Sequence, residues 1–288
     1  MNRLQIQNLA FAYSRSKRIF EDFSLELSSG INVLLGANGS GKTTLFKMLA
    51  TITVPQKGTI RLNQLDYRRD NVRPAISYIP QSFDLFPPLT PLDFLRYIGE
   101  VKYGMKGAAL EQEVQRVVEL ADLSEFTTKR MASLSEGMNR RVGIAQALMG
   151  DAVLIIADEP TAGLDPEQRE NFNQIIRRIP KEKIVLLSTH IIEDIKEFTD
   201  HLVVLSKGKA SFQGSYEAFV HSLDGRFFQL ENPTQAQLEE LQQKGRLLGR
   251  QIDDLEHRRY RYVLADPDNG PRGEAVQPTL GELWAYYE

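Results

Sequence analysis

Cysteine is missing from this 288-residue sequence. Disulfide bonds and zinc sites with thiolate ligands are therefore excluded, and the composition is compatible with a reducing compartment. An excess of positive charge is missing as well, because 35 lysine and arginine residues face 38 aspartate and glutamate residues and the formal net charge is −3. The charge balance argues against a broad surface for nucleic acid.

Long apolar runs are also missing. The longest, such as AVLIIA and IVLLS, fall far short of the roughly 20 residues that span a bilayer. The N-terminal stretch MNRLQIQNLAFAY lacks the continuous apolar segment of a secretory signal. We expect a soluble, cytosolic protein, in which any role at a membrane would come through a partner.

Short apolar runs, by contrast, are plentiful and indicate strands buried on both faces, as in the parallel sheet of an α/β protein. They are INVLLG (31–36), VLIIAD (153–158), KIVLLSTH (183–190) and HLVVLSKG (201–208). Two earlier segments, LQIQNL and FSLELS, alternate apolar and polar residues and predict half-buried antiparallel strands.

The pattern becomes helical between Pro87 and Gly150, which predicts a helical insertion at about 87–150. After Gly214 the signals are weaker and indicate a few strands and helices, the last helix opening with a capping box from Thr279 to Glu282. We expect an α/β domain over 1–214 and a small accessory α+β region over 215–288.

A glycine-rich segment, GANGSGKT, follows the first apolar run and opens a helix. It matches the P-loop pattern, in which backbone amides surround the α- and β-phosphates, the lysine reaches the β- and γ-phosphates and the final hydroxyl ligates Mg²⁺. A chance match in a chain of this length is on the order of 1%. The segment therefore predicts nucleotide binding through Gly36, Asn38, Gly39, Ser40, Gly41, Lys42, Thr43 and Thr44.

Polar residues follow two further runs, Asp158 and Glu159 after the second and His190 after the third. In isolation, acidic strand ends and single histidines are common structural features. Ligands of open α/β sheets, however, bind at the carboxyl ends of the strands, so these side chains should border the P-loop. There, an Asp can hold Mg²⁺ and a Glu can polarise an attacking water.

A second element that could face an anion begins at Ser135, in the stretch ASLSEGMNRRVGIAQALMG (132–150). The serine is a favourable N-cap, and the backbone amides at a helix start favour negative charge. The apolar positions of this helix are Val142, Ile144, Ala145, Leu148 and Met149.

Together these motifs resemble the nucleotide-binding subunit of an ATP-binding cassette (ABC) transporter, over residues 1–214. The motif order is Tyr13 as the adenine-stacking aromatic, Walker A at 36–43, Gln81 in the Q-loop, the signature LSEGM at 134–138, Walker B at 154–159, the D-loop AGLD at 162–165, and the switch residue His190. The resemblance implies a P-loop NTPase (RecA-like) parallel-sheet core with an antiparallel β subdomain.

The resemblance also implies the roles of these residues. Mg²⁺ would be held by Thr43, Gln81 and Asp158, Glu159 would act as the general base, and His190 would contact the γ-phosphate. ABC cassettes pair head to tail, so Ser135 and Gly137 would face the ATP of a second copy or a related cassette. Asp165 would join the two sites across the dimer.

The signature departs from the usual LSGGQ at Glu136 and Met138. A carboxylate beside a phosphate would be unfavourable, so we expect Glu136 to point away, toward the partner or solvent. Met138 lacks the hydrogen-bonding amide of Gln, which bears on nucleotide affinity or turnover. The segments GMNRR and PTLGELW resemble cassettes of small exporters for drugs, peptides and bacteriocins.

In the family, a groove beside the Q-loop receives a helix of an integral membrane permease. Such a subunit would be peripheral on the cytoplasmic face of the membrane. Candidate contact residues here are Phe83, Leu85, Phe86 and Leu89, whose alternative role is packing within the helical subdomain.

Two alternative functions are compatible with the cassette motifs. One is a soluble ABC ATPase acting on nucleic acid, ribosomes or protein complexes; the single cassette, the acidic charge and the lack of a long coiled-coil insertion argue against it, and no nucleic-acid partner is expected. The other is a nucleotide-gated binding module with little turnover, against which Glu159 and His190 argue.

Overall fold

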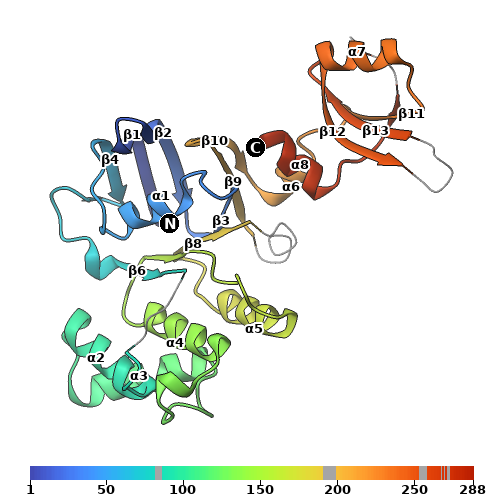
Figure 1. Cartoon of the computed structure of the whole chain (residues 1–288). Helices are drawn as coiled ribbons and strands as arrows, with labels where there is room; N and C mark the ends of the chain where they lie inside the picture. The colour runs from blue at the N-terminus through green and yellow to red at the C-terminus, as the bar shows by residue number, and fades with distance from the viewer. Residues whose placement is uncertain (82–85, 191–198, 253–257, 267, 269, 271–272) are drawn as a thin grey trace.

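A six-stranded sheet forms the centre of the fold, in the order β10-β9-β3-β8-β7-β6 (Figure 1). The computed structural model describes residues 1–288 except 82–85, 191–198, 253–257, 267, 269 and 271–272. Five strands are parallel and β10 is antiparallel to β9. The strands are β3 (Gly30–Leu35), β6 (Ile76–Ile79), β7 (Leu154–Ala157), β8 (Ile184–Thr189), β9 (His201–Ser206) and β10 (Lys209–Gly214). All four buried strands predicted from the apolar runs are confirmed.

An antiparallel sheet covers one face of this core, with α1 (Lys42–Leu49) between the two sheets. Its order is β2-β1-β4-β5. The strands are β1 (Arg3–Ser14), β2 (Lys17–Ser28), β4 (Lys57–Leu62) and β5 (Leu65–Asp66), and the 3₁₀ helix η1 (Arg73–Ala75) follows them. Side chains of both sheets and of α1 share one apolar cluster, to which β3 contributes Leu34. The predicted antiparallel β subdomain is confirmed.

Helices dominate the chain between β6 and β7, as the sequence predicts. They are α2 (Pro91–Tyr103), α3 (Gly107–Leu120), η2 (Met131–Ser133) and α4 (Glu136–Leu148), and α5 (Pro166–Arg177) follows β7. Their apolar faces form a cluster with Val185 and Leu187 of β8. Thr90 caps α2 in a capping box with Asp93, and Ser135 caps α4 by accepting from the Met138 amide.

The C-terminal segment adds a third, four-stranded sheet and three helices. The strands β11 (Phe227–Glu231), β12 (Gly245–Ile252), β13 (Arg258–Leu264) and β14 (Glu274–Ala275) pair in the order β12-β13-β11-β14, and the helices are α6 (Tyr216–Val220), α7 (Gln235–Lys244) and α8 (Leu280–Tyr287). The capping box from Thr279 to Glu282 is confirmed. Phe219 and Leu283 pack with Val33 of β3. Because successive strand residues face opposite sides, α6 and α8 lie on the face opposite α1.

Candidate functional site

The P-loop connects β3 to α1 and is shaped by its glycines. Gly41 has φ of +115° at the helix start, a conformation that side-chain-bearing residues rarely adopt, and a Cβ there would lie 2.9 Å from the Phe20 ring. A Cβ on Gly36 would lie 2.6 Å from the Leu205 carbonyl oxygen. Of the other residues predicted to bind the nucleotide, some are exposed, namely Asn38, Gly39 and Thr43. The others are buried, namely Ser40, Lys42 and Thr44.

Lys42 lies inside this loop, with only 4% of its side chain exposed. Its Nζ donates to the Gly36 carbonyl at 2.6 Å and to the Ala37 carbonyl at 3.3 Å. The same nitrogen is 3.5 Å from Oε1 of Glu159. A buried cation therefore faces the carboxyl edge of the sheet, at a loop built to approach a phosphate closely.

Glu159 is the meeting point of the predicted site residues. Its Oε2 accepts from Gln81 Nε2 at 3.2 Å and lies 3.4 Å from His190 Nδ1. Gln81, Glu159 and His190 follow β6, β7 and β8, three neighbouring parallel strands, and Lys42 follows β3. The structure thus brings together four residues that the sequence places at separate strand ends.

Asp158 lies beside this cluster and is fully buried. Ser188 Oγ donates to Asp158 Oδ1 at 2.7 Å and accepts from the Glu159 amide at 2.8 Å. Ser188 was missed in the sequence, where nothing except its place near the tip of β8 distinguishes it. Burial, and secondly the charge of Asp158, raise the pKa of Tyr78 to about 12, so this neighbouring phenol stays neutral at pH 7.

Two buried oxygens at the site, Asp158 Oδ2 and Ser40 Oγ, find no hydrogen-bond partner among the described residues. Buried polar atoms are almost always paired, so these two fit a bound group that supplies the partner. A carboxylate oxygen is a ligand that Mg²⁺ prefers, and Mg²⁺ is usually held by one or two carboxylates together with phosphate oxygens. Within the part of the chain that the structure describes, no three His, Cys, Asp or Glu side chains gather as a metal site. The unpaired Asp158 oxygen fits Mg²⁺ that is also bound by the phosphate oxygens of a nucleotide.

Tyr13 stands at the other side of the P-loop. Its hydroxyl lies 3.2 Å from Thr44 Oγ1, and its ring packs edge-on against Phe11 while 53% of the residue stays exposed. The Lys17 ammonium lies 5.7 Å from the ring centroid. An exposed ring beside a phosphate loop is suited to stacking on a base.

The signature residues form a separate site. Ser135, Gly137 and Asp165 line a cavity of about 270 Å³ between α4 and α5. Asp165 caps α5 by accepting from the Gln168 amide at 2.8 Å, and a Cβ on Gly137 would lie 2.9 Å from Gln168 Cδ. None of the hydrogen bonds or ion pairs given for the described residues joins Ser135 or Asp165 to the P-loop. Within the described residues, Ser135 and Asp165 thus cap α4 and α5 and do not bind the P-loop directly.

Comparisons with known proteins identify the family. A profile described as "ABC transporter" matches residues 20–162. The Nod factor export ATP-binding protein I of Cupriavidus metallidurans is 32% identical over 223 residues, covering 76% of this chain and 73% of that protein. The chain belongs to the ABC transporter family. It is an ABC ATPase subunit, and the resemblance drawn from its motifs is confirmed.

Other relatives differ in what their names describe. The phosphonates import ATP-binding protein of Lactiplantibacillus plantarum is 32% identical over 228 residues, covering 74% of this ABC subunit and 89% of that protein. A solved dimeric ATP-binding cassette, bound to ADP and Pi, superposes with a TM-score of 0.66 at 23% identity, covering 74% of this chain and 98% of that chain. This likeness confirms the P-loop NTPase fold.

The permease contacts expected for this ABC subunit are in part described. Phe83 and Leu85 lie outside the described residues. Phe86 is 52% exposed and neighbours Phe94 and Tyr97, with ring centroids 6.2 and 6.1 Å away. Leu89 instead packs against the helical apolar cluster, which is the alternative role of packing within the helical subdomain. Among the described residues, no helix is long and apolar enough to cross a membrane.

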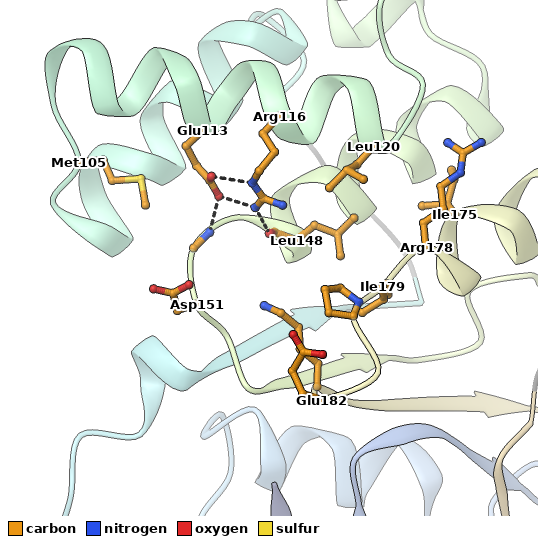
Figure 2. Close-up of a pocket in the computed structure, with 13 residues that line it drawn as sticks. Met105, Glu113, Arg116, Leu120, Leu148, Asp151, Ile175, Arg178, Ile179 and Glu182 are labelled. Atoms are coloured by element: carbon orange, nitrogen blue, oxygen red, sulfur yellow. Dashed lines mark hydrogen bonds and ion pairs between the residues drawn. The ribbon is translucent and has the colours of Figure 1, made fainter. Parts of the chain in front are cut away.

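A cavity of about 400 Å³ lies at the opposite, amino edge of the sheet, beside α3 and the residues that precede β7 and β8 (Figure 2). Its polar groups bind one another. Glu113 accepts from Arg116 at 2.6 Å and from the Gly150 amide at 2.7 Å, and Arg116 also donates to the Leu148 carbonyl at 2.8 Å. This network holds α3 against the end of α4.

Glu113→Gln is expected to lower the free energy of unfolding by about 1 kcal/mol at neutral pH, because the Arg116 guanidinium loses its charged partner. The effect stays this small because solvent screens the charge interaction of a partly exposed pair. Burial raises the pKa of Glu113, but the bonds from Arg116 and the Gly150 amide outweigh it, so the net pKa lies below its usual range. The stabilisation is therefore present above the ordinary glutamate pKa and is lost as pH falls through the lowered value. Urea denaturation of parent and variant at neutral and acidic pH measures this.

The two denaturation midpoints should converge at acidic pH. Glu111→Gln is the matched control, since Glu111 pairs with Arg96 on the exposed surface. A difference between parent and Glu113→Gln that persists unchanged in acid would contradict the role of the charge.

Proposed function

We propose that this chain binds and hydrolyses ATP in a head-to-tail dimer and thereby drives a separately encoded membrane permease, as an exporter. The observation that carries the proposal is the Glu159 carboxylate, gathered by Lys42, Gln81 and His190 at the carboxyl edge of the sheet. Of the described residues that line the cavity with Ser135 and Gly137, none belongs to this cluster. Two chains in opposite orientations would place each signature helix opposite the other chain's P-loop.

The residues of the cluster supply the chemistry of hydrolysis. Lys42 contacts the β- and γ-phosphates, and Tyr13 stacks on adenine. Thr43, Gln81 and Asp158 would hold Mg²⁺, which would neutralise negative charge on the phosphate oxygens. Glu159 accepts a proton from the attacking water, and His190, 3.4 Å from the Glu159 carboxylate, orients that carboxylate and contacts the γ-phosphate.

The partner chain completes the site. Ser135 and the amides at the start of α4 would contact the γ-phosphate of the nucleotide held by the other copy or by a related cassette. Asp165, exposed at the start of α5, would contact the partner. We assign residues 1–214 to the cassette and 215–288 to an accessory region.

The permease would contact the side of α2 that exposes aromatic rings. Phe86 and Tyr97 are both about half exposed and adjacent there. Nearby, a groove of about 610 Å³ is lined by Ile52, Arg73 and Lys102 among others. Exposed apolar groups beside such a groove fit an interface with a permease helix. Export rests on the segments GMNRR and PTLGELW, since relatives named for export and for import match equally well.

Purification from membranes in mild detergent, with mass spectrometry of bound proteins, is expected to recover a polytopic membrane protein in stoichiometric amount. The preparation should hydrolyse Mg-ATP. A Phe86→Ala, Tyr97→Ala variant should lose the membrane protein while keeping ATP binding, because the Phe86 ring lies against those of Tyr97 and Phe94 and neither substituted residue belongs to the cluster around Glu159. Recovery of ribosomal or DNA-repair proteins instead would favour the soluble ATPase.

A further inference from the structure

One buried arginine, Arg140, joins the signature helix to the segment that carries the catalytic carboxylate. Its guanidinium is 9% exposed and lies one turn after the start of α4. Nη1 donates to the carbonyls of Glu159 at 3.2 Å and Pro160 at 2.7 Å, and Nη2 donates to the carbonyl of Ala162 at 2.6 Å. Three carbonyls of the segment between Walker B and the D-loop are thus bound by one side chain.

The backbone that Arg140 binds is held in an unusual conformation. Glu159 has φ of +46°, in the left-handed region that non-glycine residues seldom occupy. Its amide donates to Ser188 Oγ, and its carbonyl accepts from both Arg140 and the Ala162 amide at 3.1 Å. Such a conformation persists when its surroundings fix it. Arg140 is therefore one of the groups that set where the Glu159 carboxylate points.

The fourth contact of the guanidinium explains the unusual signature residue. Glu136 Oε1 accepts from Arg140 Nη2 at 2.9 Å, one helical turn away. The carboxylate is close to the D-loop, since a Cβ on Gly163 would lie 3.5 Å from Glu136 Oε1. Glu136 thus points toward its own Arg140 rather than only outward, although 66% of its side chain stays exposed. A movement at the start of α4 would reach the Walker B segment through this pair.

We propose that Glu136 and Arg140 form a positioning pair that couples the two composite sites of the dimer, so that engagement of the signature helix by the partner's nucleotide adjusts Glu159 at the chain's own nucleotide. The inference rests on the head-to-tail dimer of the proposed function. Both ends of the link belong to one chain, while each end serves a different nucleotide. The pair touches neither nucleotide and acts through Glu159.

Arg140→Gln is expected to lower kcat about 10-fold to 100-fold, the cost of misplacing a catalytic group by a fraction of its contact distance. KM and the affinity for MgADP should stay unchanged, because Arg140 does not contact the P-loop. A merely structural role would lower the thermal unfolding midpoint and nucleotide binding together with turnover. Arg141→Gln, the neighbouring arginine that donates to the Asp122 carbonyl at 3.2 Å, is the matched control.

Glu136 supplies a second test that leaves the buried guanidinium in place. Glu136→Ala removes the contact and should lower kcat, whereas Glu136→Gln keeps an acceptor for Arg140 Nη2 and should retain most of it. Equal kcat in the parent and Glu136→Ala would overturn the role of the pair.

Mixed dimers of two differently tagged copies separate coupling from local support. Glu159→Gln in copy two leaves hydrolysis only at the nucleotide of copy one, while the nucleotide of copy two can still engage the signature helix of copy one. Ser135→Arg, Arg140→Gln or both are then placed in copy one, and the rate of phosphate release is measured in a single turnover. Coupling predicts that either change slows release at the nucleotide of copy one and that the two together slow it no further. Unchanged release with Ser135→Arg alone would reduce Arg140 to a support for its own Glu159 and overturn the proposal.

A dimer with Ser135→Arg in copy one as its only change tests the proposed function separately. It should release about one phosphate per dimer, half that of the parent, because the head-to-tail arrangement leaves one of two sites. Full release from this dimer would contradict the head-to-tail dimer itself, and the coupling with it.

Discussion

Glu159→Gln is expected to lower steady-state ATP hydrolysis by a factor on the order of 10² to 10⁴, the usual contribution of a general base. The amide has nearly the shape of the carboxylate and keeps an oxygen that can accept from Gln81 Nε2, now 3.2 Å from Oε2. It cannot take a proton from water. Removing the charge 3.5 Å from Lys42 also frees that ammonium for phosphate, so ATP affinity should not fall. An ATP-bound dimer should therefore accumulate.

Phosphate release and gel filtration with and without Mg-ATP measure the two effects. Glu182→Gln makes the same exchange at the amino edge of the sheet, where Glu182 precedes β8, and should leave both unchanged. Unchanged turnover in Glu159→Gln would mean that another group accepts the proton. A monomer at every nucleotide concentration would count against ATP-driven pairing of the isolated chain.

The position of the catalytic cluster could be predicted because strand ends in a parallel sheet meet at one edge. Lys42, Glu159 and His190 each follow a short apolar run, and each run became a parallel strand of the central sheet. Their side chains therefore lie close together, whatever the conformation of the loops between the strands. The N-cap Ser135 could be predicted for a different reason, because capping is a local interaction within three residues.

Ser188 and Arg140 could not be predicted, because their partners are set by tertiary contacts. Ser188 contributes one of the two hydroxyls at the end of β8, beside Thr189, and its two bonds go to a neighbouring strand end. The i,i+4 spacing of Glu136 and Arg140 does indicate a helical ion pair. It gives no sign that the guanidinium is buried against three carbonyls from residues 159, 160 and 162.

The spacing of apolar residues also does not show which element of the fold a buried helix face packs against. The apolar stripe of α8 predicts a buried face, and that much is confirmed. Only the structure places Leu283 in the cluster with Val33 on the central sheet. Leu89 illustrates the same limit, because an apolar residue beside an expected groove can pack inward as readily as it can contact a permease.

Ser135→Arg is expected to abolish hydrolysis while leaving nucleotide binding by the isolated chain intact. The serine is exposed at the start of α4, where its Oγ accepts from the Met138 amide at 3.3 Å. Loss of the cap costs about 1 kcal/mol, too little to unfold a domain of this size. The larger effect is steric, since the long arginine side chain would occupy the space that the partner's γ-phosphate must enter. Calorimetric titration with MgADP and phosphate release in Mg-ATP measure the two properties.

Ser215→Arg is the matched control, because Ser215 caps α6 in the same way, accepting from the Ala218 amide at 3.0 Å. It removes an equivalent bond at α6, which is neither the helix that follows the P-loop nor the signature helix, and should keep hydrolysis. If Ser135→Arg weakened MgADP binding as strongly as it weakened hydrolysis, the signature helix would have to contact the nucleotide of its own chain. Intact binding with lost turnover is the result expected if the start of α4 acts on a nucleotide held by a second copy of the cassette.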